Sequence, residues 1–275
     1  MARIDLPESR LRLRKRRRRL RLTAAAIVFL LLVLSGLVGL TYWPALRIAD
    51  VAVSGTSTLS SSTLEAFVRE RLAGNYWYIL PKSNIFLYPK AHIEKDILSA
   101  YPVLASADVH AADFHTVAVG VIERQPRALW CSDTCYFMDE NGVVYGEAPI
   151  FSEPVYTVYV GSTTPSTSSG QASGAPPWHY LTPTKFQALS ALVDAVIQKL
   201  SGEVLADVSI NADNDVGMRF AGGFVLKFAL HEEGGDTFER LTLALTAEPF
   251  VSHKLVEFEY LDLRFGDKLY YKLRD

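Results

Sequence analysis

One stretch of the chain carries no charge over its whole length, and it constrains the fold more than any other feature. No Asp, Glu, Lys or Arg occurs from Leu22 to Leu46, and most of this stretch reads TAAAIVFLLLVLSGLVGLTYW. About 20 apolar residues in a helix, at 1.5 Å per residue, cover roughly the 30 Å hydrocarbon layer of a bilayer. Tyr42 and Trp43 fall where aromatic side chains commonly line the membrane surface. We therefore predict a single transmembrane helix over residues 22–43.

Basic residues are concentrated on the N-terminal side of this span. Residues 1–21 hold ten Lys and Arg and two acids, which leaves 18 basic residues (28 − 10) and 28 acidic residues (30 − 2) for the rest of the chain. Because cytoplasmic flanks carry an excess of positive charge, we expect 1–21 to be a basic cytoplasmic tail and everything after Trp43 to be extracytoplasmic. A cleaved signal peptide is the alternative, but the apolar run is longer than usual and has no Ala-x-Ala site.

The same basic run raises the question of a nucleic-acid partner. Blocks of Arg can bind nucleic acid. This block adjoins the predicted span and has no interleaved aromatic residues, so a topology signal and contact with anionic lipid explain it. We expect the cytoplasmic membrane, and no nucleic acid, as its partner.

Residues 44–124 combine strand and helix patterns. IADVAV alternates like a strand and is followed by Gly55; the stretches STLSSSTLEAFVRERLAG and KAHIEKDILSAYP are helical, and Pro102 ends the second. Two alternating runs, ASADVHA and HTVAVGVIER, come next. The predicted order is strand, helix, helix, strand, strand. The side chains expected on the packed faces are Leu64, Phe67, Val68, Arg71, Leu72, Ile93, Ile97, Leu98, Tyr101, Val117, Val119 and Val121.

Residues 125–275 are mostly strand with two helices. TPTKFQALSALVDAVIQKLSG places Thr182 as N-cap, Pro183 at the first helical position and Gly202 beyond the end. VSINADNDVGMRFAGGFVLKFAL predicts three strands separated by turns, and DTFERLTLALTAE predicts a second helix. The side chains expected in the core are Phe186, Leu189, Val193, Val196, Ile197, Leu200, Phe224, Leu226, Phe228, Leu230, Phe238, Leu241 and Leu245.

Within this part, GSTTPSTSSGQASGAPP, residues 161–177, has almost nothing to bury. We expect a flexible surface loop there. Its Ser, Thr and Pro content would also suit glycosylation.

The chain ends on YLDLRFGDKLYYKLRD, which predicts a hairpin. Leu261–Phe265 and Lys268–Arg274 flank Gly266 and Asp267, a pair that suits a two-residue turn. The apolar phase shifts near Tyr260, so a bulge or bend is expected there. A last strand of this kind is normally an edge strand, whose unpaired N–H and C=O groups a second chain can use. Its two predicted faces are Leu269, Tyr271 and Leu273 against Lys268, Tyr270, Lys272 and Arg274.

Two cysteines, Cys131 and Cys135, are separated by three residues in a part that we place outside the cytoplasm. Disulfides persist there, so a structural disulfide that clamps a turn is the preferred interpretation. Free thiols remain an alternative. A metal site would need more ligands, and a redox role would favour a Cys-x-x-Cys spacing.

No motif for catalysis is recognisable. The six histidines are scattered without a metal-binding pair, and no GxSxG, SxxK or GxxxxGK[ST] occurs. A facing pair of carboxylates remains possible in any fold. We expect a protein that is not an enzyme, with no catalytic residues, cofactor, metal or small-molecule substrate.

Several segments together resemble the POTRA domain and the following strand of the FtsQ/DivIB bacterial cell-division family. They are IADVAVSGTSTLS, NIFLYPKAHIEKDILSAYPVLASADVH, VAVGVIERQPRALW and FMDENGVVYG, and LDLRF resembles a late strand of the family. The resemblance covers most of the chain outside the tail and the loop 161–177. Its landmarks are Gly55, Asn84–Leu87, Pro102, Glu123, Arg124, Pro126, Trp130, Asp139 and Gly142.

The resemblance implies an α+β protein: one transmembrane helix, a POTRA-like βααββ module over 44–124 and a mostly antiparallel β domain with two helices over 125–275. It also implies a non-catalytic scaffold of the cell membrane, enriched at the septum, that links FtsB/DivIC-like and FtsL-like partners to septal peptidoglycan synthesis. Phe265, just after Arg264, falls where the family has an aromatic partner contact. The candidate partner-binding residues are Arg264, Phe265, Leu269, Tyr270, Tyr271, Lys272 and Leu273.

Other interpretations remain. The aromatic residues of the last hairpin could simply pack on the sheet. The chain could be another POTRA-bearing secretion or outer-membrane assembly factor, although these usually carry a β-barrel and repeated POTRA units. It could also be a membrane-anchored cell-wall enzyme, in which case replacing one pocket residue would abolish activity.

Overall fold

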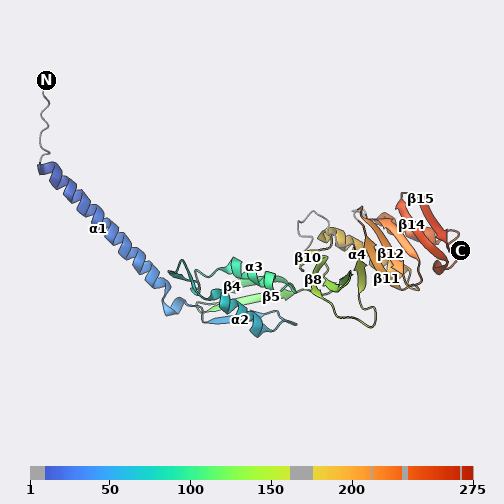
Figure 1. The fold of residues 1–275 in the computed structure, drawn as a ribbon, viewed down its shortest axis with the longest axis horizontal. Helices are drawn as coiled ribbons and strands as arrows, with labels where there is room; N and C mark the ends of the chain where they lie inside the picture. The colour runs from blue at the N-terminus through green and yellow to red at the C-terminus, as the bar shows by residue number, and fades with distance from the viewer. Residues whose placement is uncertain (1–9, 162–175, 212, 231–234, 267, 275) are drawn as a thin grey trace, which may run out of the picture. The chain divides into compact units, whose positions relative to one another are not determined.

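The computed structural model describes residues 10–161, 176–211, 213–230, 235–266 and 268–274. The protein is an α+β fold that divides into two compact units, Met1–Glu123 and Arg124–Asp275 (Figure 1). We call them unit 1 and unit 2 and describe each by itself.

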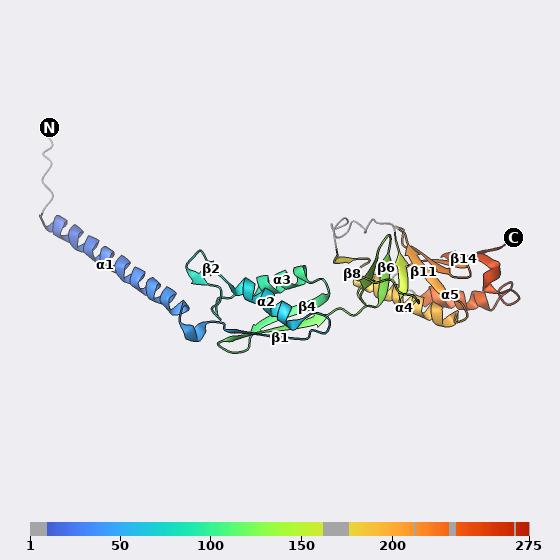
Figure 2. The same cartoon turned by 60° about the horizontal axis from the view of Figure 1, so that its bottom comes forward.

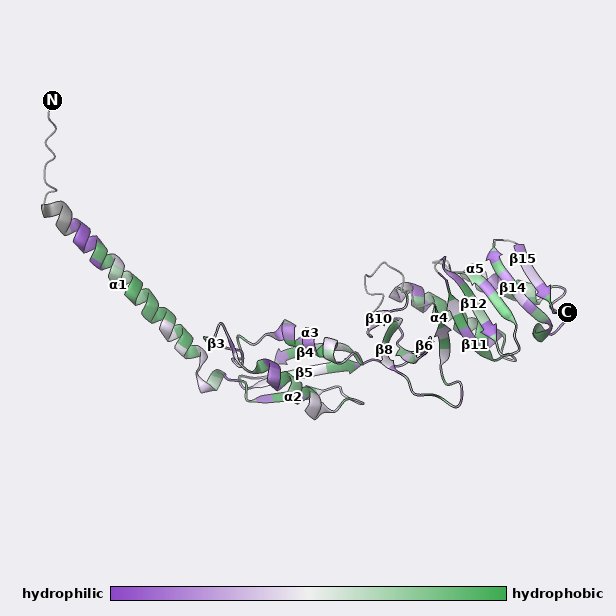
Figure 3. Ribbon diagram, in the orientation of Figure 1, coloured by the Kyte–Doolittle hydropathy of each residue, from purple (hydrophilic) through white to green (hydrophobic). Residues whose placement is uncertain are grey.

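The first element, α1, is a continuous helix over Arg10–Thr41. Its part from Lys15 to Thr41 is long and apolar enough to cross a membrane, and Figure 3 shows the change from a hydrophilic start to a hydrophobic remainder. The basic residues from Arg10 onward are helical too, so no structural break separates the predicted tail from the predicted span. The helix ends two residues before the predicted limit at Trp43, because a 3₁₀ turn over Pro44–Leu46 follows.

Unit 1 contains a three-stranded sheet in the order β1-β5-β4, in which β1 is parallel and β4 antiparallel to β5. Helix α2 packs on β1, α3 packs on β4, and the two helices contact each other (Figure 2). A short hairpin, β2–β3, lies between the helices in sequence and adds to the predicted element order. The bounds are β1 Asp50–Ser54, α2 Ser61–Leu72, β2 Asn75–Tyr76, β3 Leu80–Pro81, α3 Lys90–Ala100, β4 Leu104–Ala111 and β5 Thr116–Glu123.

The core of unit 1 follows the predicted apolar periodicity. Its sheet contributes alternate valines of β5, and its helices contribute one stripe each. Among the predicted core positions, the fully buried ones are Leu64, Val68, Leu72, Ile93, Ile97, Val117, Val119 and Val121, whereas Phe67, Leu98 and Tyr101 are partly buried against them.

The turn after β1 is held by a buried carboxylate at the end of β5. Gly55 has φ +89°, and a Cβ there would lie 1.9 Å from a backbone oxygen of β5. Glu123 accepts hydrogen bonds from the backbone N–H groups of Ser57, Thr58 and Leu59 and from the hydroxyls of Ser57 and Thr58. Burial opposes ionisation of Glu123, but these bonds outweigh it and hold its pKa well below the usual range.

Unit 2 contains a ten-stranded sheet in the order β10-β8-β7-β6-β9-β11-β12-β13-β14-β15. Most neighbours are antiparallel, as predicted, but β9 is parallel to β6 and β11, and β14 is parallel to β13. Parallel neighbours need a crossover connection, and α5 supplies it between β13 and β14. The bounds are β6 Ala128–Cys131, β7 Cys135–Met138, β8 Val143–Glu147, β9 Thr157–Val160, β10 Trp178–His179, β11 Leu205–Ile210, β12 Asp215–Phe220, β13 Val225–Ala229, β14 Phe258–Phe265 and β15 Lys268–Leu273.

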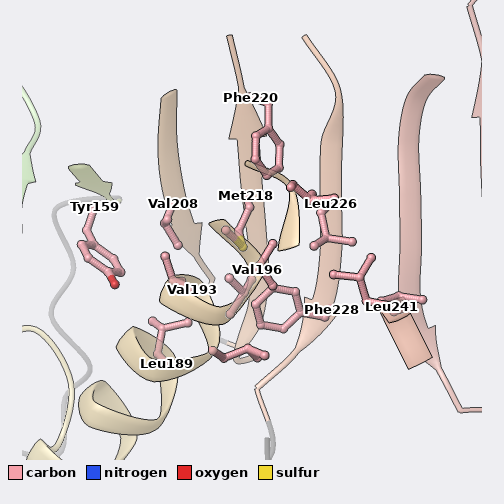
Figure 4. Close-up of a cluster of buried hydrophobic side chains, with 14 of the residues drawn as sticks. Tyr159, Leu189, Val193, Val196, Val208, Met218, Phe220, Leu226, Phe228 and Leu241 are labelled. Atoms are coloured by element: carbon pink, nitrogen blue, oxygen red, sulfur yellow. The ribbon is translucent and has the colours of Figure 1, made fainter. Parts of the chain in front are cut away.

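Helix α4 (Pro183–Lys199) covers the sheet of unit 2, and α5 (Gly235–Leu245) and a 3₁₀ turn (Leu255–Glu257) follow later in the chain. Figure 4 shows the side chains of α4 directed at those of the strands, and the core includes Leu189, Val193, Val196, Val208, Met218 and Phe228. Thr182 is the N-cap residue and Pro183 opens the helix. The helix ends at Lys199 with Leu200 as its C-cap, so Gly202 lies beyond the end, as predicted.

Two predicted local features concern loops of unit 2. Cys131 and Cys135 face each other across the β6–β7 turn and form a disulfide, and no free cysteine is present in the described chain. Most of the predicted loop 161–177, namely residues 162–175, lies outside the described residues.

Candidate partner-binding edge

Strand β15 lies at one end of the unit 2 sheet (Figure 1). It pairs with β14 on one side, and among the described residues no strand pairs with its other side. The last strand is therefore an edge that offers backbone donors and acceptors to another chain.

The β14–β15 hairpin is irregular where its sequence predicts irregularity. The register shifts between Phe258 and Tyr260, where the apolar phase changes, and shifts again between Asp262 and Phe265. Gly266 in the turn has φ +56°, a conformation that glycine adopts without strain. Asp267, the second predicted turn residue, lies outside the described residues.

Two observations determine which way the backbone of β15 faces. Arg274 donates its N–H to the carbonyl of Glu257 at 2.8 Å, and Lys268 pairs with Phe265 across the two-residue turn. In an antiparallel pair, successive residues point alternately toward and away from the partner strand. Even-numbered residues of β15 therefore face β14. The N–H and C=O groups of Leu269, Tyr271 and Leu273 point outward.

The side chains of the edge form two faces. On one, Leu269 packs against the core and the ring of Tyr271 lies 5.6 Å from that of Phe250. On the other, the rings of Phe265 and Tyr270 lie 5.3 Å apart, edge to face. Phe265, Tyr270 and Tyr271 nevertheless remain 53%, 48% and 45% exposed. These rings pack on their neighbours, as the conservative interpretation expects, and still leave apolar surface for a partner.

Two charged residues of the hairpin, Lys272 and Arg264, differ in burial and in the partners they bind. Lys272 is exposed and forms an ion pair with Glu259 at 2.5 Å. Arg264 is committed inside the sheet: its Nε and Nη2 bind Asp262 and its Nη1 binds Asp215 of β12 at 2.7 Å. Of the predicted partner contacts, Arg264 is thus the one that the structure assigns to holding β14 in place.

This ion-pair network shifts the pKa of two groups, Asp262 and Arg264. Burial opposes the charge on Asp262, but the hydrogen bonds from Arg264 outweigh it and lower the pKa of the carboxyl. Hydrogen bonds to Asp262 and Asp215 raise the pKa of Arg264 in turn. Sequence patterns did not predict this network. One signal could have found it, because Asp262 stands between two core leucines in LDLRF and a buried carboxylate needs a partner.

The described residues contain no cluster of three or more His, Cys, Asp or Glu placed to hold a metal ion. No family model matches the chain, and no curated protein matches it either. The fold and the exposed edge of β15 are therefore the observations that bear on function.

Proposed function

We propose that this chain is a non-catalytic membrane scaffold of the FtsQ/DivIB type. Its N-terminus lies in the cytoplasm, α1 crosses the cell membrane, and units 1 and 2 lie outside. There it gathers FtsB/DivIC-like and FtsL-like division proteins at the septum and links them to peptidoglycan synthesis. The observation that carries this proposal is the open edge of β15.

The arrangement of unit 1 supports the proposal. Its main elements follow the order strand, helix, helix, strand, strand, with the first and last strands paired in parallel, and the β2–β3 hairpin is an insertion between the helices. This is the order on which the resemblance to a POTRA domain rests. The position of the unit directly after an apolar helix supports the same family.

A partner strand added to β15 would continue the sheet. The outward groups of Leu269, Tyr271 and Leu273 would supply main-chain hydrogen bonds, which give affinity. The exposed Phe265–Tyr270 pair would contact side chains of the partner and so contribute to its selection. No pocket or cofactor is needed for this mode of binding.

Localisation tests the proposal directly. A fluorescent fusion in the bacterium that produces the protein should concentrate at the division septum, and depletion should block division. A uniform membrane signal with normal division after depletion would rule the scaffold role out. The topology has its own test, since a reporter active only outside the cytoplasm should work when fused after Arg47; activity confined to the cytoplasm would reverse the orientation.

A further inference from the structure

The tip of the β2–β3 hairpin in unit 1 exposes large apolar side chains in an unfavourable backbone conformation. Trp77 and Tyr78 are 84% and 97% exposed and have φ of +46° and +65°. The turn closes with a hydrogen bond from the N–H of Ile79 to the carbonyl of Tyr76 at 2.9 Å. Two successive residues with positive φ form the turn type that prefers Asn-Gly. Aromatic residues are unfavourable in this turn conformation, and their exposure to water is unfavourable too. Both observations indicate that the tip contacts another molecule or a membrane.

This hairpin is attached to the end of α1. Tyr42 donates its hydroxyl to the carbonyl of Ile79 at 2.5 Å, and Asn84 donates its side-chain N–H to the carbonyl of Thr41 at 2.9 Å. The N–H of Ile85 bonds the carbonyl of Leu46 at 3.0 Å. Figures 2 and 3, in different orientations, both show the hairpin beside the C-terminal end of α1.

A second pair of exposed rings lies on two loops, one between β3 and α3 and the other between β4 and β5. Phe86 and Phe114 contact each other edge to face at 6.4 Å. Both rings are next to residues that hydrogen-bond the chain just after α1. Phe86 follows Ile85, whose N–H donates to Leu46, and Phe114 precedes His115, whose carbonyl accepts from the N–H of Ala49. The exposed residues Trp77, Tyr78, Ile79, Phe86 and Phe114 all lie on segments that hydrogen-bond residues 42–49, the chain just after α1, and each is more than half exposed; we call these five side chains the juxtamembrane aromatic surface.

The charges around this surface are compatible with a bilayer. The ammonium of Lys82 lies 5.7 Å from the ring centre of Tyr76, at the base of the hairpin. The acid beside Phe114 is Asp113, whose carboxylate accepts hydrogen bonds from the N–H groups of His115 and Thr116. The tip itself carries no charge from Tyr76 to Pro81.

We propose that the juxtamembrane aromatic surface inserts into the interfacial layer of the leaflet from which α1 emerges. Trp and Tyr favour this layer because their rings are apolar while their N–H and O–H groups still reach water. The hydrogen bonds to Thr41, Tyr42 and Leu46 keep the surface within reach of the headgroups. Unit 1 is then held on the membrane by two attachments, α1 and the aromatic tip. This inference rests on the proposed membrane anchoring of α1.

Depth measurements on the full chain test the inference. The Ile79→Cys protein is labelled with a fluorophore at position 79 and reconstituted into vesicles of phosphatidylethanolamine and phosphatidylglycerol. The measured quantity is the quenching of its fluorescence by lipids that carry a nitroxide near the headgroup. The same label at Ser99→Cys, exposed near the C-terminal end of α3, is the surface control. Leu31→Cys in α1 reports the anchor. We expect quenching at position 79 to exceed that at position 99 several-fold.

A matched variant separates the rings from the attachment. Trp77→Asn with Tyr78→Gly installs the residues that the turn prefers, so the hairpin should stay folded while the label at position 79 loses its quenching. If quenching persists in this variant, or if positions 79 and 99 behave alike, the aromatic surface does not insert. If instead the label at position 31 stays accessible to an aqueous quencher, the anchoring itself is wrong.

Discussion

Glu123 is the most informative position for testing how unit 1 is held together. Its Oε1 accepts N–H groups of Ser57, Thr58 and Leu59 at 2.7, 3.0 and 3.1 Å, and its Oε2 accepts the two hydroxyls at 2.6 and 2.7 Å. Glu123→Gln keeps an acceptor for the N–H groups, and the hydroxyls can rotate, so the main loss is charge. A hydrogen bond to a charged group contributes about 1.5–3 kcal/mol, against about 0.5–1.5 kcal/mol for a neutral one.

The five donor groups share one carboxylate, so their losses do not add. We expect Glu123→Gln to lower the free energy of unfolding by about 2 kcal/mol. Glu123→Ala leaves the buried N–H donors without an acceptor, so its cost should reach about 3–4 kcal/mol.

The contribution of Glu123 should also depend on pH. Its pKa in the folded protein lies below the value of about 4.3 for an unfolded chain. The stabilisation is therefore fully present above the unfolded pKa and is lost as pH falls toward the folded pKa, because the unfolded chain binds the proton first. The difference between the wild type and Glu123→Gln should stay constant from pH 7 down to about pH 4.3 and shrink below that, so that it is smaller at pH 3.

Hydrogen exchange of the full chain in detergent measures both effects. At pH 7, peptides from β1 and β5 should exchange roughly 30-fold faster in Glu123→Gln, since 1.4 kcal/mol corresponds to a factor of ten. Peptides from β11 and β12 are the internal control. Equal protection of β1 in both proteins, or a difference that stays constant down to pH 3, would show that the charge of Glu123 does not stabilise unit 1.

Three further changes test separate parts of the fold. Gly55→Ala should destabilise unit 1 by at least about 1 kcal/mol, because of its positive φ and the close backbone oxygen; unchanged exchange of β1 would contradict this. Arg264→Met leaves the buried carboxylate of Asp262 without its partner, so it should lower the stability of β14 by about 3 kcal/mol. Adding Asp262→Asn removes that unpaired charge and should restore part of the stability; no recovery would argue against the network. Mass spectrometry of the unreduced protein should find Cys131 joined to Cys135, not two alkylatable thiols, and replacing both by Ala should cost about 2 kcal/mol because the closed loop is short.

Local patterns in the sequence predict much of this fold. The stripe of α4, from Phe186 to Leu200, and the alternation of β13 depend only on the period of the element, so the sequence contains them directly. The register shift beside Tyr260 was also predictable, since two apolar residues of opposite phase cannot share one face without a bulge.

Features that depend on distant residues were not predictable in this way. The parallel pairing of β9 with β6 and β11 joins segments with no shared local signal. Trp77 and Tyr78 occupy a turn whose usual residues are Asn and Gly, so turn preferences gave no indication of the hairpin. Apolar periodicity also does not show that a carboxylate such as Glu123 finds its donors some sixty residues earlier in the chain.

The direction of the β15 backbone provides the most direct test of partner binding at the edge. Because the N–H of Tyr271 points outward, proline is tolerated there by the β14–β15 pairing but removes a donor that an added strand needs. Tyr271→Ala is the matched control, since it removes the same ring. The measurement is the affinity of the detergent-solubilised full chain for an FtsB-like partner, with exchange of β14 as the check on folding. We predict binding about tenfold weaker for Tyr271→Pro than for Tyr271→Ala, as expected for one lost hydrogen bond. Equal affinities of the two variants, with β14 intact in both, would contradict strand addition at this edge.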